Sequence, residues 1–179
     1  MADQPLESSD IAKLLKKLVK NVEKAFAVWD DVVFIGIRSG GEHIARHIVG
    51  LLAVKIGKTL PLGALDIALY RDDLSKRLLY PEVRRTDIPF DVHDKIVILV
   101  DDVLNTGRSV RAAIDHIVDL GRPRRIYLLV IFDRGGRELP IQADFVGKVI
   151  SLPPDKIIKI NIPEDKKSVG DIIITEEKR

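Results

Sequence analysis

The sequence contains no cysteine among its 179 residues. This absence excludes disulfide bonds, catalysis by a thiolate, and zinc sites built on cysteine. A Walker A loop is also missing, because no Gly-x-x-x-x-Gly-Lys-Ser/Thr motif precedes a predicted helix, and this disfavours hydrolysis of a nucleoside triphosphate. The chain shows no repeat, low-complexity segment or linker, and its length suits one α/β domain with a substantial core.

Long hydrophobic runs and an excess of one charge are missing as well. No run approaches the roughly twenty apolar residues of a membrane-spanning helix. Residues 1–10 are polar and acidic and lack an apolar signal segment, so we expect a cytoplasmic protein with no membrane contact. The formal net charge is only +2, so the overall charge gives no argument for nucleic acid binding, although local basic clusters remain.

The most informative stretch begins with the apolar residues 96–100. They do not alternate with polar residues, which predicts a strand covered on both faces, as in a parallel sheet. The strand runs into Asp101 and Asp102, and a helix with an apolar face follows. The next strand is predicted over residues 125–132, and the inward helix residues are predicted to be Val110, Ala113, Ile114, Ile117 and Val118. Ligands of open α/β sheets bind at the carboxyl ends of strands, where both aspartates lie.

Residues 105–109 form the turn between this strand and its helix. Their backbone N–H groups and the helix dipole favour an anion, Gly107 permits close approach, and the Thr106 and Ser109 hydroxyls can donate to phosphate oxygens. The two aspartates suit a sugar diol or a metal. The aspartates and the turn together therefore suit a phosphorylated ribose. The alternative is an acidic turn with an N-cap and an ordinary Thr-Gly connector.

A second corner of the same kind follows the predicted strand over residues 32–37. Glycines follow that strand, and the next helix is expected to turn Ile44, Ile48, Leu51 and Leu52 inward. This corner supplies a site for a second phosphate group. His43 and His47 lie one helical turn apart on the same helix; we interpret them as surface or capping residues, the alternative being a zinc site.

Three further segments complete the reading of the chain. Residues 8–10 are expected to cap a helix with an apolar stripe and many lysines, which form either a solvated face or a surface for an anionic partner. Residues 62–70 are predicted to form a strand. Residues 71–95 form a long loop, and such loops in compact domains are functional or poorly ordered.

The stretch over residues 96–109 resembles the phosphoribosyl pyrophosphate (PRPP) motif of type I phosphoribosyltransferases. The resemblance implies an α/β fold with a mostly parallel central sheet, flanking helices, a small hood and a flexible lid loop. It also implies that Asp101 and Asp102 are catalytic and hold the ribose hydroxyls, directly or through Mg²⁺. The residues implied for the 5′-phosphate and ribose are Asp101, Asp102, Val103, Leu104, Asn105, Thr106, Gly107, Arg108 and Ser109.

The same resemblance assigns the second corner and the long loop. The implied pyrophosphate loop is Arg38, Ser39, Gly40 and Gly41, and the lid cations that would close over pyrophosphate include Arg71, Lys76 and Arg77. We therefore predict a single phosphoribosyltransferase domain over residues 1–179. Its lid would span about residues 71–95, and its hood about residues 150–179 with N-terminal parts.

Longer segments are similar to the PyrR family, the pyrimidine-operon attenuator proteins with uracil phosphoribosyltransferase activity. They are residues 65–76, 119–123 and 133–148. The family implies transfer of phosphoribose from PRPP to uracil, giving UMP and pyrophosphate with Mg²⁺, and a homodimer or higher homo-oligomer. Arg134 or Arg137 would contact the nucleotide. The alternative is a UMP-responsive attenuator that binds messenger RNA and has weak or no enzyme activity.

Four positions bear on which of these functions is retained. Asn105 replaces the carboxylate of relatives that act on 6-oxopurines, and an amide cannot accept a proton at neutral pH, which disfavours that branch. Gly40 lacks the arginine side chain usual in the attenuators. Gly136 and Gln142 replace a histidine and an arginine of the surface implicated in RNA binding. The departure at Gly40 weakens the enzyme hypothesis, and the departures at Gly136 and Gln142 weaken the regulator hypothesis.

Overall fold

The computed structural model describes residues 8–38, 40–70, 72, 85–153, 156–161 and 171–176. Its centre is a five-stranded sheet of order β2-β1-β3-β4-β5 in which every pairing is parallel. The strands are β1 (Val32–Ile37), β2 (Leu62–Leu65), β3 (Ile96–Leu104), β4 (Arg125–Asp133) and β5 (Phe145–Val149). The predicted parallel α/β architecture is therefore confirmed.

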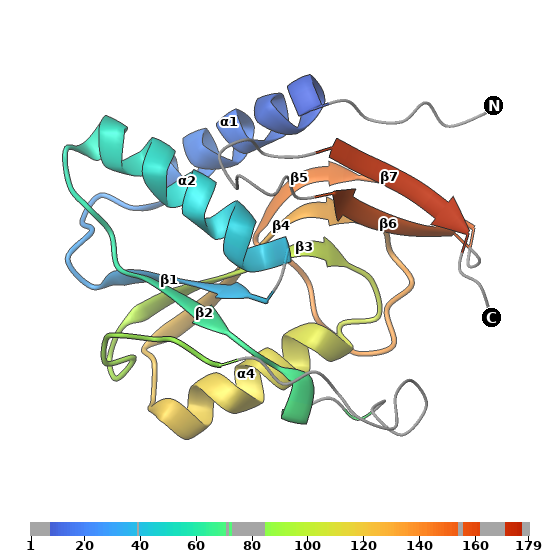
Figure 1. The fold of residues 1–179 in the computed structure, drawn as a ribbon. Helices are drawn as coiled ribbons and strands as arrows, with labels where there is room; N and C mark the ends of the chain where they lie inside the picture. Colours follow the sequence, from blue (N-terminus) through green and yellow to red (C-terminus); the bar gives the residue numbers. More distant parts are fainter. Residues whose placement is uncertain are drawn as a thin grey trace.

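Within the described ranges, three α-helices cover the two faces of this sheet (Figure 1). They are α1 (Ser8–Ala25), α2 (Gly40–Ile56) and α4 (Arg108–Leu120). One hydrophobic cluster joins α1 and α2 to alternate strand residues such as Phe34 and Ile98, and a second joins α4 to their neighbours, such as Ile35 and Leu99. Because successive strand side chains point to opposite faces, the unbroken apolar runs supply both clusters.

A separate two-stranded antiparallel sheet lies on the α1 side of the main sheet, near the arrowheads of β3 and β5 (Figure 1). It pairs β6 (Lys156–Asn161) with β7 (Asp171–Glu176). Both strands fall inside the segment predicted as the hood. The assignment of this segment as a hood, and the single-domain organisation, stay predictions. No helix in the described ranges is long and apolar enough to cross a membrane.

Residues 62–70 differ from the predicted single strand. β2 ends at Leu65, and a 3₁₀ turn, η1 (Ala68–Tyr70), follows. The carboxylate of Asp66 accepts a hydrogen bond from the Ala68 N–H at 2.9 Å, which bends the backbone out of the extended conformation. The prediction of a strand was therefore correct only for its first half.

Smaller corrections concern helix faces and the end of β3. Leu51 and Val118 were predicted to face inward but are 39% and 57% exposed, because each lies at the edge of an apolar stripe that is narrower than the sequence suggests. Residues 8–10 lie in the first turn of α1 rather than before it. β3 continues through both aspartates to Leu104, where it still pairs with Asp133 of β4.

Candidate functional site

A cavity of about 340 Å³ lies at the carboxyl ends of β1, β2 and β3. Adjacent parallel pairing of β1 and β3 brings their carboxyl ends to the same edge of the sheet, with Gly36 opposite Val100. The cavity is lined by Ile37, Arg38, Gly40, Asp66, Ile67, Ala68, Asp101, Asp102, Val103 and Ser109. The two strand-to-helix corners singled out in the sequence therefore face one shared cavity.

The β1–α2 corner fits against β3 because two of its residues, Gly40 and Gly41, have no side chains. A Cβ added to Gly41 would lie 3.0 Å from the Cα of Asp101, and closer still to the Val100 carbonyl. A Cβ on Gly40 would lie 2.8 Å from the Cγ of Asp102 and closer to its Oδ2. Both glycines are thus required by close approach, which brings the first turn of α2 against the aspartate pair.

Arg38 reaches the cavity from the end of β1. Its N–H donates to the Leu65 carbonyl at 2.9 Å, and its Nη1 lies 3.3 Å from Oε2 of Glu42. Its Nε is buried and finds no hydrogen-bond partner within the described residues. A guanidinium with unused donors facing a cavity is suited to a phosphate oxygen. Ser39 lies outside the described residues.

The aspartate pair is held by the backbone of β3. Asp101 is only 7% exposed, and its Oδ1 accepts from the Asp102 N–H at 2.9 Å. Oδ1 of Asp102 accepts from the Val103 N–H at 2.8 Å. Burial raises the pKa of Asp102 above its usual range, and the hydrogen bonds from Asp101 and the backbone only partly oppose this. The carboxylate is therefore costly to leave unpaired and is stabilised by any bound hydroxyl or cation.

The β3–α4 corner lines the cavity with Ser109 and places the start of α4 beside it. Gly107 caps α4 in a left-handed conformation, φ +91°, and makes no side-chain cap. The guanidinium of Arg108 turns to Glu138 at 2.5 Å and to Asp72 at 2.6 Å. The helix N-terminus thus offers its dipole to an anion while the Arg108 side chain is engaged elsewhere.

The β4–β5 turn packs on this corner through Arg137. Its Nη1 donates to the carbonyls of Asn105, at 2.9 Å, and Gly135, at 3.2 Å, while its Nε donates to Ile141, at 2.8 Å. Its Nη2 donates to the Asp133 carboxylate at 2.5 Å. These partners place Arg137 as a clamp within the protein, which favours a positioning role; its predicted contact with the nucleotide stays a prediction.

Arg134 is less constrained than Arg137. Its Nη2 donates at 3.3 Å to the carbonyl of Pro153, which lies between β5 and β6, and its N–H donates at 3.0 Å to Leu104. The predicted lid cations Arg71, Lys76 and Arg77 lie outside the described residues. Their assignment stays a prediction.

Sequence reasoning missed one wall of the cavity, residues 66–68. The Asp66 carbonyl lies 3.0 Å from Nδ1 of His116 on α4, and His116 stacks on Tyr70 with ring centroids 4.2 Å apart. The Tyr70 hydroxyl donates to Asp119 at 2.8 Å. A signal was present, because Asp66 directly follows an apolar strand, as the Asp101–Asp102 pair does.

His43 was expected at the surface but is only 5% exposed, which is a correction. It packs edge-on against His47, with ring centroids 4.7 Å apart, on a part of α2 that the core covers. Within the described residues no group of three or more His, Asp or Glu side chains is arranged to hold a metal.

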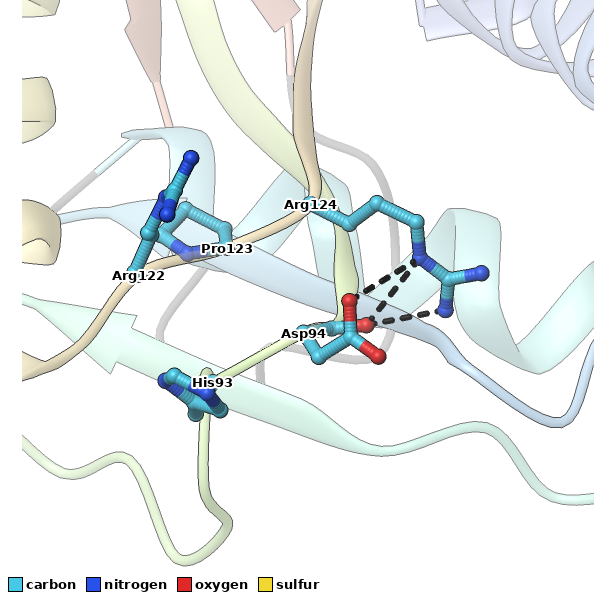
Figure 2. Close-up of a pocket in the computed structure, with 5 residues that line it drawn as sticks. All are labelled: His93, Asp94, Arg122, Pro123 and Arg124. Atoms are coloured by element: carbon cyan, nitrogen blue, oxygen red, sulfur yellow. Dashed lines mark hydrogen bonds and ion pairs between the residues drawn. The ribbon is translucent and has the colours of Figure 1, made fainter.

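A second cavity, of about 360 Å³, lies at the opposite edge of the sheet, beside the starts of β3 and β4. Figure 2 shows Arg124 directed at Asp94, and Arg122 pointing away from it. Arg124 donates to the Asp94 carbonyl at 2.8 Å and to Asp31 at 2.7 Å. Arg124, one of the two arginines that line this cavity, is already neutralised, and none of the described lining residues begins a helix, so this cavity suits a polyphosphate less well than the first.

Comparison with known proteins agrees with this geometry. A family model described as "Phosphoribosyl transferase domain" matches residues 1–165. "Bifunctional protein PyrR" of Chloroflexus aurantiacus is 46% identical over 96% of this chain and 93% of that protein. The chain belongs to the PyrR family of phosphoribosyl transferases. The PyrR of Thermus aquaticus is similar as well, at 44% identity over 89% of this chain and 88% of that protein.

Solved structures show the same fold for this PyrR-family chain. A hypoxanthine-guanine phosphoribosyltransferase of Bacillus anthracis has a TM-score of 0.67 at 20% identity, covering 88% of this chain and 87% of that one. The hypoxanthine phosphoribosyltransferase of Trypanosoma cruzi has a TM-score of 0.69 at 15% identity, covering 99% and 98%. The predicted type I phosphoribosyltransferase fold is confirmed.

Proposed function

We propose that this protein transfers the phosphoribosyl group of PRPP to uracil, giving UMP and pyrophosphate. The observation that carries the proposal is the convergence of the Gly40–Gly41 corner and the Asp101–Asp102 pair on one cavity. PRPP carries a pyrophosphate and a 5′-phosphate on either side of a diol. A site with two helix N-termini and a carboxylate pair between them matches that order of groups.

Each part of the site then has a role in the transfer. The C1–O bond of the ribose breaks with its electron pair leaving on pyrophosphate, N1 of uracil forms the new bond to C1, and the N1 proton is released. Arg38 and the backbone of the β1–α2 corner would hold the leaving pyrophosphate and stabilise its growing charge. Asp101 and Asp102 would fix the ribose hydroxyls so that the base approaches in line.

Mg²⁺ is the cofactor that fits this donor set. Carboxylate oxygens of Asp101 and Asp102, together with the hydroxyl and phosphate oxygens of the substrate, are the ligands that Mg²⁺ prefers. The raised pKa of Asp102 is consistent with a carboxylate that gains from a nearby cation. When bound, the ion would neutralise charge on the pyrophosphate.

A panel of bases tests the proposal. Purified protein is incubated with PRPP, Mg²⁺ and either uracil, hypoxanthine, guanine or orotate, and pyrophosphate release is measured. Release with uracil only is the expected result. Release with a purine base instead would refute the choice of uracil while leaving phosphoribosyl transfer in place.

A second candidate function is UMP-responsive binding of messenger RNA. The curated relatives are named bifunctional, and α1 carries a row of exposed lysines. Lys16, Lys20 and Lys24 have no ion-pair partner among the described residues, so they are available to phosphates. Lysine neutralises phosphate but lacks the planar fork that reads guanine.

A gel shift with the leader RNA of the chain's own pyrimidine operon tests this second function. Tight binding that UMP strengthens would support the regulator. Weak binding that is indifferent to UMP would retire it.

A further inference from the structure

Two consecutive glycines in the β4–β5 turn have nearly the same φ angle and different surroundings. Gly135 has φ +71° and Gly136 has φ +70°, both left-handed. A Cβ added to Gly135 would meet nothing within 4 Å, whereas a Cβ added to Gly136 would lie 2.8 Å from Oδ1 of Asn105. The turn conformation requires both glycines, but only Gly136 also makes room for a neighbouring side chain.

The amide of Asn105 is placed by this turn without being paired by it. The Asn105 backbone carbonyl accepts from Arg137 at 2.9 Å, and Asn105 is half-buried. Its side chain makes no hydrogen bond with any residue that the structure describes. A half-buried amide carries two donors and an acceptor, and such groups in native proteins usually have partners.

The position of this amide links it to the site. Asn105 directly follows β3, three residues after Asp102, at the same edge of the sheet as the cavity. The turn that holds it is fixed to the β3–α4 corner, since Glu138 and Leu139 donate to the Thr106 carbonyl at 3.0 and 3.2 Å. Asn105 therefore follows β3 at the edge of the sheet that carries the cavity, next to the end of β4.

We propose that Gly136 is a positioning residue for Asn105, and that the pair sets how much room the base has at its end of the site. The inference rests on the proposed function, because it takes the ribose to lie against Asp101 and Asp102. With no side chain at position 136, the amide lies over the turn and stays clear of the cavity. A side chain there would drive the amide toward the space that the base needs.

The chemistry of the amide fits an uncharged base with a mixed edge. Uracil presents an N–H donor flanked by two carbonyl acceptors, and a carboxamide offers the complementary acceptor and donors. The side-chain amide therefore affects the affinity for the base, whereas PRPP binding depends on the backbone N–H groups of the two corners and on the aspartates. This separation gives the test its readout.

The neighbouring glycine supplies a matched control. Gly135→Ala and Gly136→Ala introduce the same methyl group at nearly the same positive φ, but only Gly136→Ala meets Asn105. We expect Gly136→Ala to raise KM for the base at least tenfold, Gly135→Ala to raise it less than threefold, and KM for PRPP to change less than twofold in both. Thermal unfolding of both variants reports the shared backbone strain.

Asn105→Ala completes the design. In that background Gly136→Ala has no amide to displace, so its additional effect on KM for the base should fall to that of Gly135→Ala. Equal effects of the two glycine variants, or a Gly136→Ala effect that persists without Asn105, would overturn the inference.

Failure of the proposed function remains distinguishable from failure of this inference. Absence of transfer to every base by the unaltered protein would count against the proposed function alone. The unaltered protein and the same four variants are then compared by calorimetric titration with UMP. There the order of Gly136→Ala and Gly135→Ala affinities supports or overturns the inference in the same way.

Discussion

Gly40 at the start of α2 lies directly against the carboxylate of Asp102 on β3, with no room for a Cβ between them. This contact joins two segments that are 62 positions apart in the chain into one wall of the cavity. An arginine at position 40 would require the aspartate or the first turn of α2 to move.

Gly40→Ala is expected to weaken PRPP binding more than it weakens the fold. The added methyl group pushes the Asp102 carboxylate aside, which a short side chain achieves by rotating. We expect KM for PRPP to rise about tenfold, equivalent to roughly 1.4 kcal/mol of lost binding. Steady-state kinetics with varied PRPP measures this.

Gly50→Ala is the matched control on the same helix, because a Cβ at Gly50 meets nothing within 4 Å. It should leave KM for PRPP unchanged and stabilise the protein by about 0.5–1 kcal/mol, since glycine is unfavourable inside a helix. A similar rise in KM in both variants would contradict the assigned contact.

Asp101→Asn and Asp102→Asn are each expected to lower turnover with PRPP by about a hundredfold while the fold survives. The amide keeps the shape of the carboxylate but removes its charge and one acceptor, so the ribose is held less accurately. Turnover is measured by pyrophosphate release and folding by circular dichroism. Asp30→Asn, which changes an exposed aspartate paired with Lys58, is the control. It should leave both the rate of pyrophosphate release and the circular dichroism spectrum unchanged. Unchanged kinetics in both site variants would remove the aspartates from the site.

The stability of the unliganded protein should reveal the raised pKa of Asp102. Because burial raises this pKa in the folded state, the folded state binds more protons than the unfolded one between the unfolded and folded pKa values. The protonated Asp102 carboxyl contributes its full stabilisation below about pH 3.8, which is the ordinary pKa of an aspartate in the unfolded chain. This contribution is lost as the pH rises through the pKa of Asp102 in the folded state. Asp102→Asn should therefore have a higher Tm than the unaltered protein at neutral pH. The difference should narrow as the pH falls toward 4, and differential scanning calorimetry across that range measures it.

Arg137→Lys is expected to destabilise the protein by roughly 1–3 kcal/mol. Lysine cannot donate to three carbonyls and a carboxylate from one planar group, so several half-buried acceptors lose their partner. Arg134→Lys loses only one long hydrogen bond to Pro153 and should cost within about 0.5 kcal/mol. Urea unfolding compares them. Equal losses would show that the Arg137 contacts contribute little to the fold.

Much of the fold was predictable from local patterns. The apolar runs that form β1, β3 and β4 were located within a few residues, and the helix expected after the aspartate pair is α4. Predictions failed where a single side chain changed the backbone path, as Asp66 does after β2. They also failed where packing determined burial, as at His43, Leu51 and Val118.

The sequence by itself determined the two strand-to-helix corners. A buried strand, a glycine or aspartate turn and an amphipathic helix are each specified by neighbouring residues, and together they make an anion-binding corner wherever they occur. Only the tertiary structure decided that the corners share a cavity. The order β2-β1-β3-β4-β5 depends on pairing between distant segments, and no local pattern states which strands become neighbours. The contacts of Gly40 with Asp102, and of Gly136 with Asn105, exist for the same reason.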